Sequence, residues 1–163
     1  MDELRKLARS LGFHAIDAGW SEYSEAVWLK DLLEAERRER ERRGLERRLK
    51  EANIGRFKPM TEFDWSWPKK VDRQQVEELF SLDFMEKPEN IVLIGTNGLG
   101  KTMIAQNLVY QAVMSGCGAQ AVKASAMLDA LLQCGDGSKR KSLMGKFCRI
   151  PLLLIDEVGY MSY

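Results

Sequence analysis

The residues whose types and spacing indicate chemistry lie at 95–102, where the chain reads GTNGLGKT. The stretch matches G-x-x-x-x-G-K-[ST], a loop whose backbone N–H groups surround phosphate oxygens. Glycines suit this loop, because a side chain at 98 or 100 would obstruct the anion or forbid the turn. We expect the Lys101 ammonium to reach the β- and γ-phosphates of a nucleotide and the Thr102 hydroxyl to bind Mg²⁺. The residues expected to contact the nucleotide are Gly95, Thr96, Asn97, Gly98, Leu99, Gly100, Lys101, Thr102 and Met103.

An acidic pair, Asp156 and Glu157, directly follows the apolar run LLLI at 152–155. At the end of a strand beside the loop, the Asp156 carboxylate can help to hold Mg²⁺ together with Thr102. Glu157 can orient a water and polarise it for attack on the γ-phosphate, so Glu157 and Lys101 are the expected catalytic residues. The plain alternative is that the two acids only cap the strand.

Residues 156–159 also spell D-x-x-G, a pattern found in GTPases. The chain contains no N-K-x-D sequence that would recognise guanine. An acid immediately after the metal-binding aspartate favours an ATPase with a carboxylate base. ATP and Mg²⁺ are therefore the expected cofactors.

The elements that must position the phosphate loop are a strand before it and a helix after it. The apolar, β-branched run at 91–94 predicts the strand, and the pattern from about residue 100 predicts a helix that Gly116 ends. A second strand is expected near residues 119–124, followed by a helix that Ser125 caps.

The remaining elements lead to the acidic pair. Residues 134–142 (CGDGSKRKS) are expected to form a polar surface loop, and a short helix is expected through 143–147. The continuous apolar run at 152–155 predicts a strand buried on both faces. Strand, helix, strand, helix, strand is typical of an α/β parallel sheet.

One long helix is predicted from about residue 24 to residue 52, where the chain lacks proline and apolar residues recur at helical spacing. Its middle section is strongly charged, with acids placed four residues before bases, an arrangement that supports a helix. The predicted pairs are Glu34/Arg38, Glu36/Arg40, Glu39/Arg43 and Glu46/Lys50. Two interpretations stay open: a solvated helix laced with ion pairs, or a basic strip that neutralises nucleic-acid phosphates.

Residues 54–71 mix Gly, Pro and aromatics without a period and are expected to be a linker. Its aromatics, Phe63, Trp65 and Trp67, are expected to anchor it to the following domain rather than to stack on bases. Asp72 with Gln75 predicts a helix start, and Pro88 is expected to end that helical region. The expected domains are thus a helical region at 1–53, the linker at 54–71, and a nucleotide-binding domain at 72–163.

Composition places the chain among ordinary globular proteins, with 163 residues, 45% apolar and 30% charged. No apolar run approaches the roughly 18 residues that a membrane span requires. The first residues lack the apolar stretch of a secretory signal, and the three cysteines show no paired metal-ligand spacing. We expect a cytoplasmic protein with reduced thiols and no membrane partner.

Taken together, these motifs resemble the IstB-like ATPases, accessory proteins of insertion-sequence transposition that are similar to the DnaC helicase loaders of the AAA+ class. The resemblance covers most of the chain, from ERRGLERRLKEANI and FDW through LFSLDFMEKPENIVLIG, GTNGLGKT and AVKASAMLDAL to LLLIDEVGY. The family usually has His where this chain has Met103 and prolines where it has Thr96 and Asn97. None of these three positions is an inferred ligand through its side chain.

The resemblance implies an incomplete, AAA+-like P-loop NTPase sheet preceded by an α-helical N-terminal region. It also implies ATP binding and hydrolysis in a homo-oligomer on duplex DNA that directs a transposase, with the helical region at 1–53 engaged in DNA contact and assembly and the domain at 72–163 only partial. A helicase loader with a replicative helicase as partner, or a non-enzymatic DNA-binding and assembly module, are the alternatives.

The resemblance further implies a continuation beyond residue 163, and we expect the chain to be C-terminally truncated. A family member would add a strand with a polar sensor residue and, later, an arginine finger. That strand would lie between the phosphate-loop strand and the Asp-Glu strand, so its loss would leave two unpaired edges. Hydrolysis is therefore expected to be impaired.

Overall fold

The computed structural model describes residues 3–67, 71–87 and 89–158. Predictions that involve Pro88 or Gly159 lie outside these residues, as do three positions of the predicted linker. The chain divides into two compact units, residues 1–46 and 47–163, and the division falls within one helix. No helix in the described part of the chain is long and apolar enough to cross a membrane.

The first unit is entirely helical. It contains α1 (Glu3–Ser10), α2 (His14–Ala18), α3 (Trp20–Tyr23) and the greater part of α4 (Val27–Ala52). Its core consists of Ala8, Leu11, Leu29 and Leu33, each less than a tenth exposed. Leu29 and Leu33 lie one helical turn apart on α4, so one face of this helix closes the small core.

Helix α4 confirms the long helix predicted from about residue 24 to residue 52, although it begins at Val27. Two of the predicted pairs form, Arg40 with Glu36 and Arg43 with Glu39, each at 2.6 Å. The predicted pairs Glu34/Arg38 and Glu46/Lys50 were wrong, since neither occurs among the described ion pairs. Arg42 explains the second case, because it lies between Glu39 and Glu46 and binds both.

The second unit begins with the end of α4 and a segment of irregular backbone that packs on helix α6 (Lys101–Met114). Phe63 is buried here with Val76, Ile104 and Leu108. The expected anchoring of the linker by aromatics is therefore confirmed for Phe63 and Trp65, whereas it was wrong for Trp67, which is 59% exposed. A short 3₁₀ helix, η1 (Met60–Glu62), precedes this anchor.

The backbone of the linker is fixed to α6 by one buried amide. Asn107 on α6 accepts from the Met60 N–H and donates to the carbonyls of Lys58 and Met103. Its side chain thus replaces the backbone partners that an irregular segment lacks.

Helix α5 (Arg73–Leu79) starts as the sequence predicted, with the Asp72 carboxylate accepting from the Gln75 N–H at 3.1 Å. The helix is shorter than the apolar pattern suggested. It ends at Leu79, Leu82 adopts φ +65°, and the chain continues in the 3₁₀ helix η2 (Asp83–Glu86).

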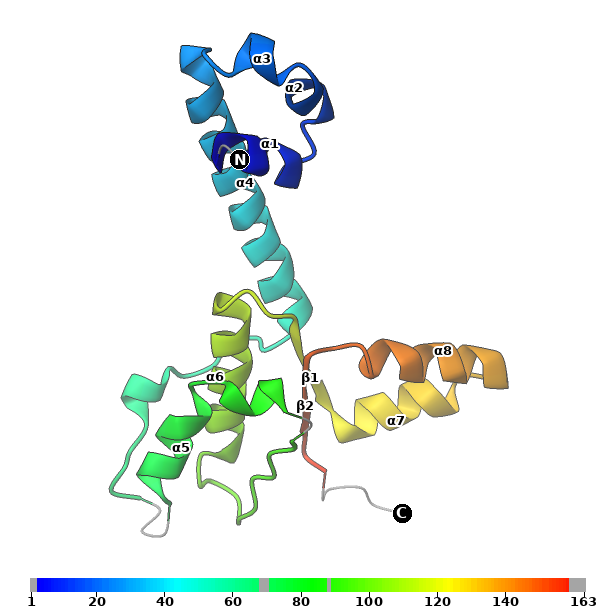
Figure 1. Ribbon diagram of the computed structural model, residues 1–163. Helices are drawn as coiled ribbons and strands as arrows, with labels where there is room; N and C mark the ends of the chain where they lie inside the picture. The colour runs from blue at the N-terminus through cyan, green and yellow to red at the C-terminus, as the bar shows by residue number, and fades with distance from the viewer. Residues whose placement is uncertain (1–2, 68–70, 88, 159–163) are drawn as a thin grey trace. The chain divides into compact units, whose positions relative to one another are not determined.

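A two-stranded parallel sheet forms the centre of the second unit (Figure 1). Strand β1 (Ala119–Lys123) pairs with β2 (Leu152–Asp156), with Ala119 opposite Leu152 and Lys123 opposite Asp156. Helix α6 covers one face, and α7 (Ala124–Leu132) and α8 (Gly137–Phe147) lie together on the other side. This mixed helix and sheet agrees with the predicted α/β class and its helical N-terminal region.

The predicted strand at 91–94 does not form. Its side chains still alternate: Ile91 and Leu93 pack on the Phe63 core, while Val92 and Ile94 are 74% and 91% exposed. The backbone is thus extended, but no strand of the described chain lies beside it to complete a hydrogen-bonded ladder. For the same reason β2 is not buried on both faces as predicted, and Ile155 is 39% exposed.

Two further predictions about helix starts were wrong. Ser125 does not cap α7, because β1 runs directly into the helix and Lys123 occupies the cap position. Most of the segment 134–142 is not a loop, because α8 begins at Gly137. Asp136 starts it by accepting from the Ser138 N–H at 2.9 Å.

Candidate functional site

The loop at 95–102 turns tightly into α6. Gly98 and Gly100 both adopt φ +81°, a left-handed conformation that residues with a Cβ rarely occupy. Gly100 precedes the first residue of α6, and its carbonyl accepts the first helical hydrogen bond, from the Ile104 N–H. The loop therefore delivers its backbone to a helix N-terminus, where N–H groups favour an anion.

Gly100 is also restricted by a neighbour that the motif does not contain. A Cβ at this position would lie 2.5 Å from Cε2 of the buried Phe63 ring, whereas a Cβ at Gly98 would meet nothing within 4 Å. Phe63 in turn contacts Trp65, with ring centroids 4.7 Å apart. The linker thus packs directly against the phosphate loop, a contact that sequence spacing alone could not reveal.

Lys101 folds back over the loop that precedes it. Its Nζ donates to the Thr96 carbonyl at 2.7 Å. The ammonium is therefore placed on the loop, beside the backbone that is expected to bind phosphate.

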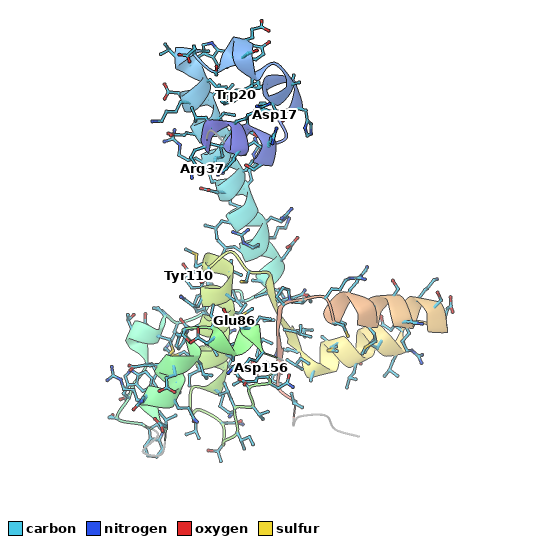
Figure 2. All side chains as sticks on the ribbon, viewed as in Figure 1. Asp17, Trp20, Arg37, Glu86, Tyr110 and Asp156 are labelled. Atoms are coloured by element: carbon cyan, nitrogen blue, oxygen red, sulfur yellow. The ribbon has the colours of Figure 1, made fainter. Side chains whose placement is uncertain are left out.

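Thr102 and Asp156, which are 54 positions apart in sequence, meet in the structure. The Thr102 hydroxyl donates to the Asp156 Oδ2 at 3.0 Å. The first turn of α6 supplies Thr102 and the last residue of β2 supplies Asp156, at the strand end shown in Figure 2. The other carboxylate oxygen, Oδ1, accepts from the Glu157 N–H at 2.8 Å, which fixes the carboxylate plane.

This pair of oxygens fits Mg²⁺, a hard cation that proteins bind through one or two carboxylates together with substrate phosphates. Within the described residues, no group of three or more His, Cys, Asp or Glu side chains could hold a metal ion. A cation that takes most of its ligands from a nucleotide and water needs no such group. The donor set therefore suits Mg²⁺ and offers nothing to a metal that requires several nitrogen or sulfur ligands.

Glu157 leaves the strand in a left-handed conformation, with φ +59°. Its Oε1 forms an ion pair with the Lys123 Nζ at 2.9 Å, and both side chains are roughly half exposed. Lys123 was not predicted as a site residue. The sequence feature that could have identified Lys123 is its position at the carboxyl end of β1. Parallel strands bring their carboxyl ends to the same edge of a sheet.

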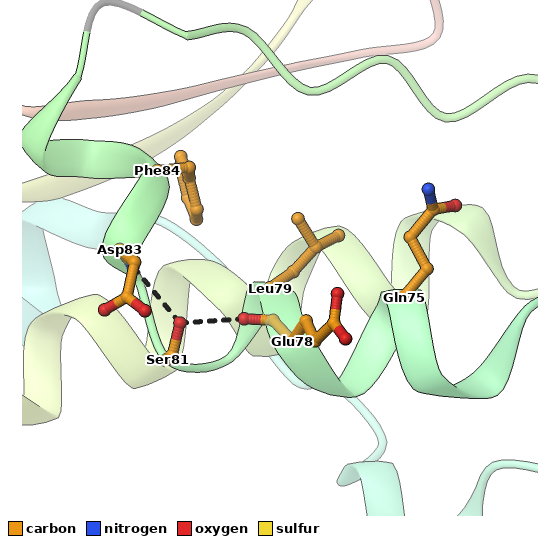
Figure 3. Close-up of a pocket in the computed structure, with 6 residues that line it drawn as sticks. All are labelled: Gln75, Glu78, Leu79, Ser81, Asp83 and Phe84. Carbon is orange, nitrogen blue, oxygen red and sulfur yellow. Dashed lines mark hydrogen bonds between the residues drawn. The ribbon is translucent and has the colours of Figure 1, made fainter.

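A shallow pocket elsewhere in the second unit involves none of the predicted site residues (Figure 3). It is lined by Gln75, Glu78, Leu79, Ser81, Asp83 and Phe84. The Ser81 hydroxyl donates to the Glu78 carbonyl and accepts from the Asp83 N–H. These contacts hold the turn at Leu82, so the pocket is part of the connection between α5 and η2.

Comparison with known proteins identifies a family and relatives whose descriptions agree with one another. The family described as IstB-like ATP binding protein matches residues 2–163. A protein of insertion sequence IS21 from Pseudomonas aeruginosa is 31% identical over 129 residues, 79% of this chain and 49% of its own length. A protein of IS5376 from Geobacillus stearothermophilus is 30% identical, over 86% of this chain and 55% of its own length.

A third relative, from insertion sequence IS232 of Bacillus thuringiensis subsp. berliner, is 28% identical over 98% of this chain and 64% of its own length. The names of all three contain the words ATP-binding protein. The chain thus spans between about half and two thirds of the length of these relatives.

Proposed function

The chain belongs to the family of IstB-like ATP-binding proteins, and we propose on this premise that it binds Mg-ATP as a helper of DNA transposition. The observation that carries the proposal is the hydrogen bond between Thr102 and Asp156. It joins the end of the phosphate loop to the acidic strand end, which are the two places that hold Mg²⁺ in P-loop proteins. Insertion-sequence names among the relatives favour a transposase over a replicative helicase as partner.

Each residue of the site has a distinct task in this proposal. Backbone N–H groups of the loop 95–103 bind the phosphates, assisted by the N-terminus of α6. The Lys101 ammonium moves from the Thr96 carbonyl to the β- and γ-phosphates, a short movement because it already lies on the loop. Thr102 and Asp156 would hold Mg²⁺, which when bound neutralises phosphate charge.

Glu157 is the proposed base for hydrolysis, and its ion pair with Lys123 supports the proposal that turnover is slow. A carboxylate that binds an ammonium is poorly available to accept a proton from water, and Lys123 lies 2.9 Å from Glu157. We expect ATP to bind more readily than it is hydrolysed by this chain. Duplex DNA and self-association complete the proposed role, by analogy with the family.

Titration calorimetry with ATP, with and without Mg²⁺, tests the proposal. We expect magnesium-dependent binding that Lys101→Ala and Asp156→Asn each weaken at least tenfold, a loss of about 1.4 kcal/mol. Lys30→Ala, an exposed change on α4, should leave the affinity unchanged. Absence of nucleotide binding by the unaltered chain at millimolar ATP would refute the proposal.

The role of Glu157 is tested separately by phosphate release. Lys123→Gln should raise the turnover rate several-fold while leaving ATP affinity nearly unchanged, and adding Glu157→Gln should abolish the gain. A lower rate in Lys123→Gln alone would instead assign Lys123 to the phosphates.

A further inference from the structure

The region from Gly137 to Ile155 contains no acidic residue. Its basic residues are Lys139, Arg140, Lys141, Lys146 and Arg149. They lie on α8 and in the turn that follows it. This surplus of positive charge was not part of the predicted site, because the segment was expected to be an ordinary polar loop.

One of the five cations has a structural task. Arg140 donates to the carbonyls of Leu131 and Cys134, at the end of α7. Leu143 and Phe147, three and seven positions further along α8, share this face and are partly buried. This face is therefore the inner one.

The remaining four cations are exposed. None of them forms an ion pair with a described residue. They are Lys139, Lys141, Lys146 and Arg149.

The outer face of α8 combines these cations with small residues. Ser138, Lys141, Ser142, Gly145 and Lys146 recur at spacings of three and four, so they form one stripe along the helix. The Arg149 guanidinium lies over Gly145, with Nη1 3.9 Å from where a glycine Cβ would be. Such a face lets a polyanion approach the helix closely, with hydroxyl donors in the middle and cations beside them.

Helix α4, the strip predicted to contact nucleic acid, differs in part. Its Arg38, Arg47 and Lys50 are exposed and form no ion pair with a described residue, but other arginines of the strip are paired. Its arginines at 40, 42 and 43 are engaged by glutamates on the same helix, at 2.6 to 2.8 Å for the pairs with Glu36 and Glu39. A phosphate would have to compete with these carboxylates. On α8 no carboxylate has to be displaced.

We propose that α8, with Lys141, Lys146 and Arg149 as its principal cations, is a contact surface for the phosphate backbone of duplex DNA. The only aromatic on α8, Phe147, lies on the inner face, so the outer face has no platform on which unpaired bases could stack. This favours a duplex over a single strand. The inference rests on the proposed DNA partner and assigns that contact to a surface distinct from the nucleotide loop.

The test compares two triple variants of the full chain that remove the same charge. One replaces Lys141, Lys146 and Arg149 by Gln, and the matched control replaces Arg40, Arg42 and Arg43 by Gln. Binding of a labelled duplex is measured by fluorescence anisotropy across a salt series. The α8 variant should flatten the slope of log affinity against log salt by about 2.7, from three phosphate contacts at about 0.9 each. The α4 variant should change the slope by less than about 0.9, the value for one phosphate contact.

Two controls keep this test separate from the nucleotide proposal. Circular dichroism shows that each variant is folded, and Mg-ATP affinity, measured on the same samples, should be equal in both. An unchanged slope in the α8 variant, a larger loss in the α4 variant, or no duplex binding by the unaltered chain would overturn the assignment. Tighter binding of a single strand than of the duplex would also overturn it.

Discussion

At the scale of single residues, Gly98 and Gly100 share a conformation but not an environment. Both adopt φ +81°, yet only Gly100 faces the Phe63 ring. Gly98→Ala should lower the free energy of unfolding by about 1–2 kcal/mol through backbone strain. Gly100→Ala should lower the free energy of unfolding by about 1–3 kcal/mol more than Gly98→Ala does, because the Phe63 ring must also move.

Urea denaturation without nucleotide, followed by circular dichroism, measures both changes. Gly137→Ala is the control, because nothing lies within 4 Å of a Cβ there and φ is not positive. Equal losses for the two loop variants would mean that the Phe63 contact carries no energy.

The sequence predicted the site residues that belong to a motif but not the others. The phosphate loop and the acidic strand end predicted that Thr102 and Asp156 act together although 54 positions separate them, and their hydrogen bond is consistent with this. Phe63 and Lys123 belong to neither motif, so the motifs did not indicate that they contact Gly100 and Glu157. Such contacts depend on how linker and strands pack.

At the scale of elements, helix α6 depends on a polar contact as well as on its apolar face. Asn107 makes three hydrogen bonds, two of them to the linker backbone at Lys58 and Met60. Asn107→Ala should reduce the free energy of unfolding by about 1–3 kcal/mol, because buried backbone groups lose their partner.

Thermal and urea denaturation measure this loss, with Gln111→Ala on the same helix as a control that should change little. A loss no larger than that of the control would show that water replaces the amide at the linker.

Two helices and two strands lie close to where the sequence predicted them, whereas the strand predicted at 91–94 does not form, and the difference has a physical reason. A helix completes its hydrogen bonds within its own segment, so the patterns of α4 and α6 were enough to locate both. A strand needs a neighbour. The run at 91–94 has the composition and alternation of a strand, but pairing depends on a second segment at its side.

At the scale of the whole molecule, acid stability should depend on carboxylates of the N-terminal unit. Hydrogen bonds from Arg9 first and then Arg5 hold the pKa of Asp17 below its ordinary value. Hydrogen bonds from Arg42 and Arg43 lower the pKa of Glu39 to about 2. A carboxylate with a lowered pKa stabilises the fold while it is charged, at pH above its unfolded-state pKa, and this contribution is lost as pH falls through the folded-state value.

The two carboxylates should not contribute equally, because their surroundings differ. The Asp17 side chain is 21% exposed and joins two helices through Arg5 and Arg9, at 2.6 Å each. The Glu39 side chain is 36% exposed and its partners lie on the same solvated helix, where ion pairs contribute little. Asp17→Asn should therefore lower the midpoint of thermal unfolding at neutral pH and reduce its further decline between about pH 4.5 and 2. Glu39→Gln should change the midpoint and its decline in acid far less. If Glu39→Gln had the larger effect, α4 rather than the junction of α1 and α2 would limit the acid stability of this unit.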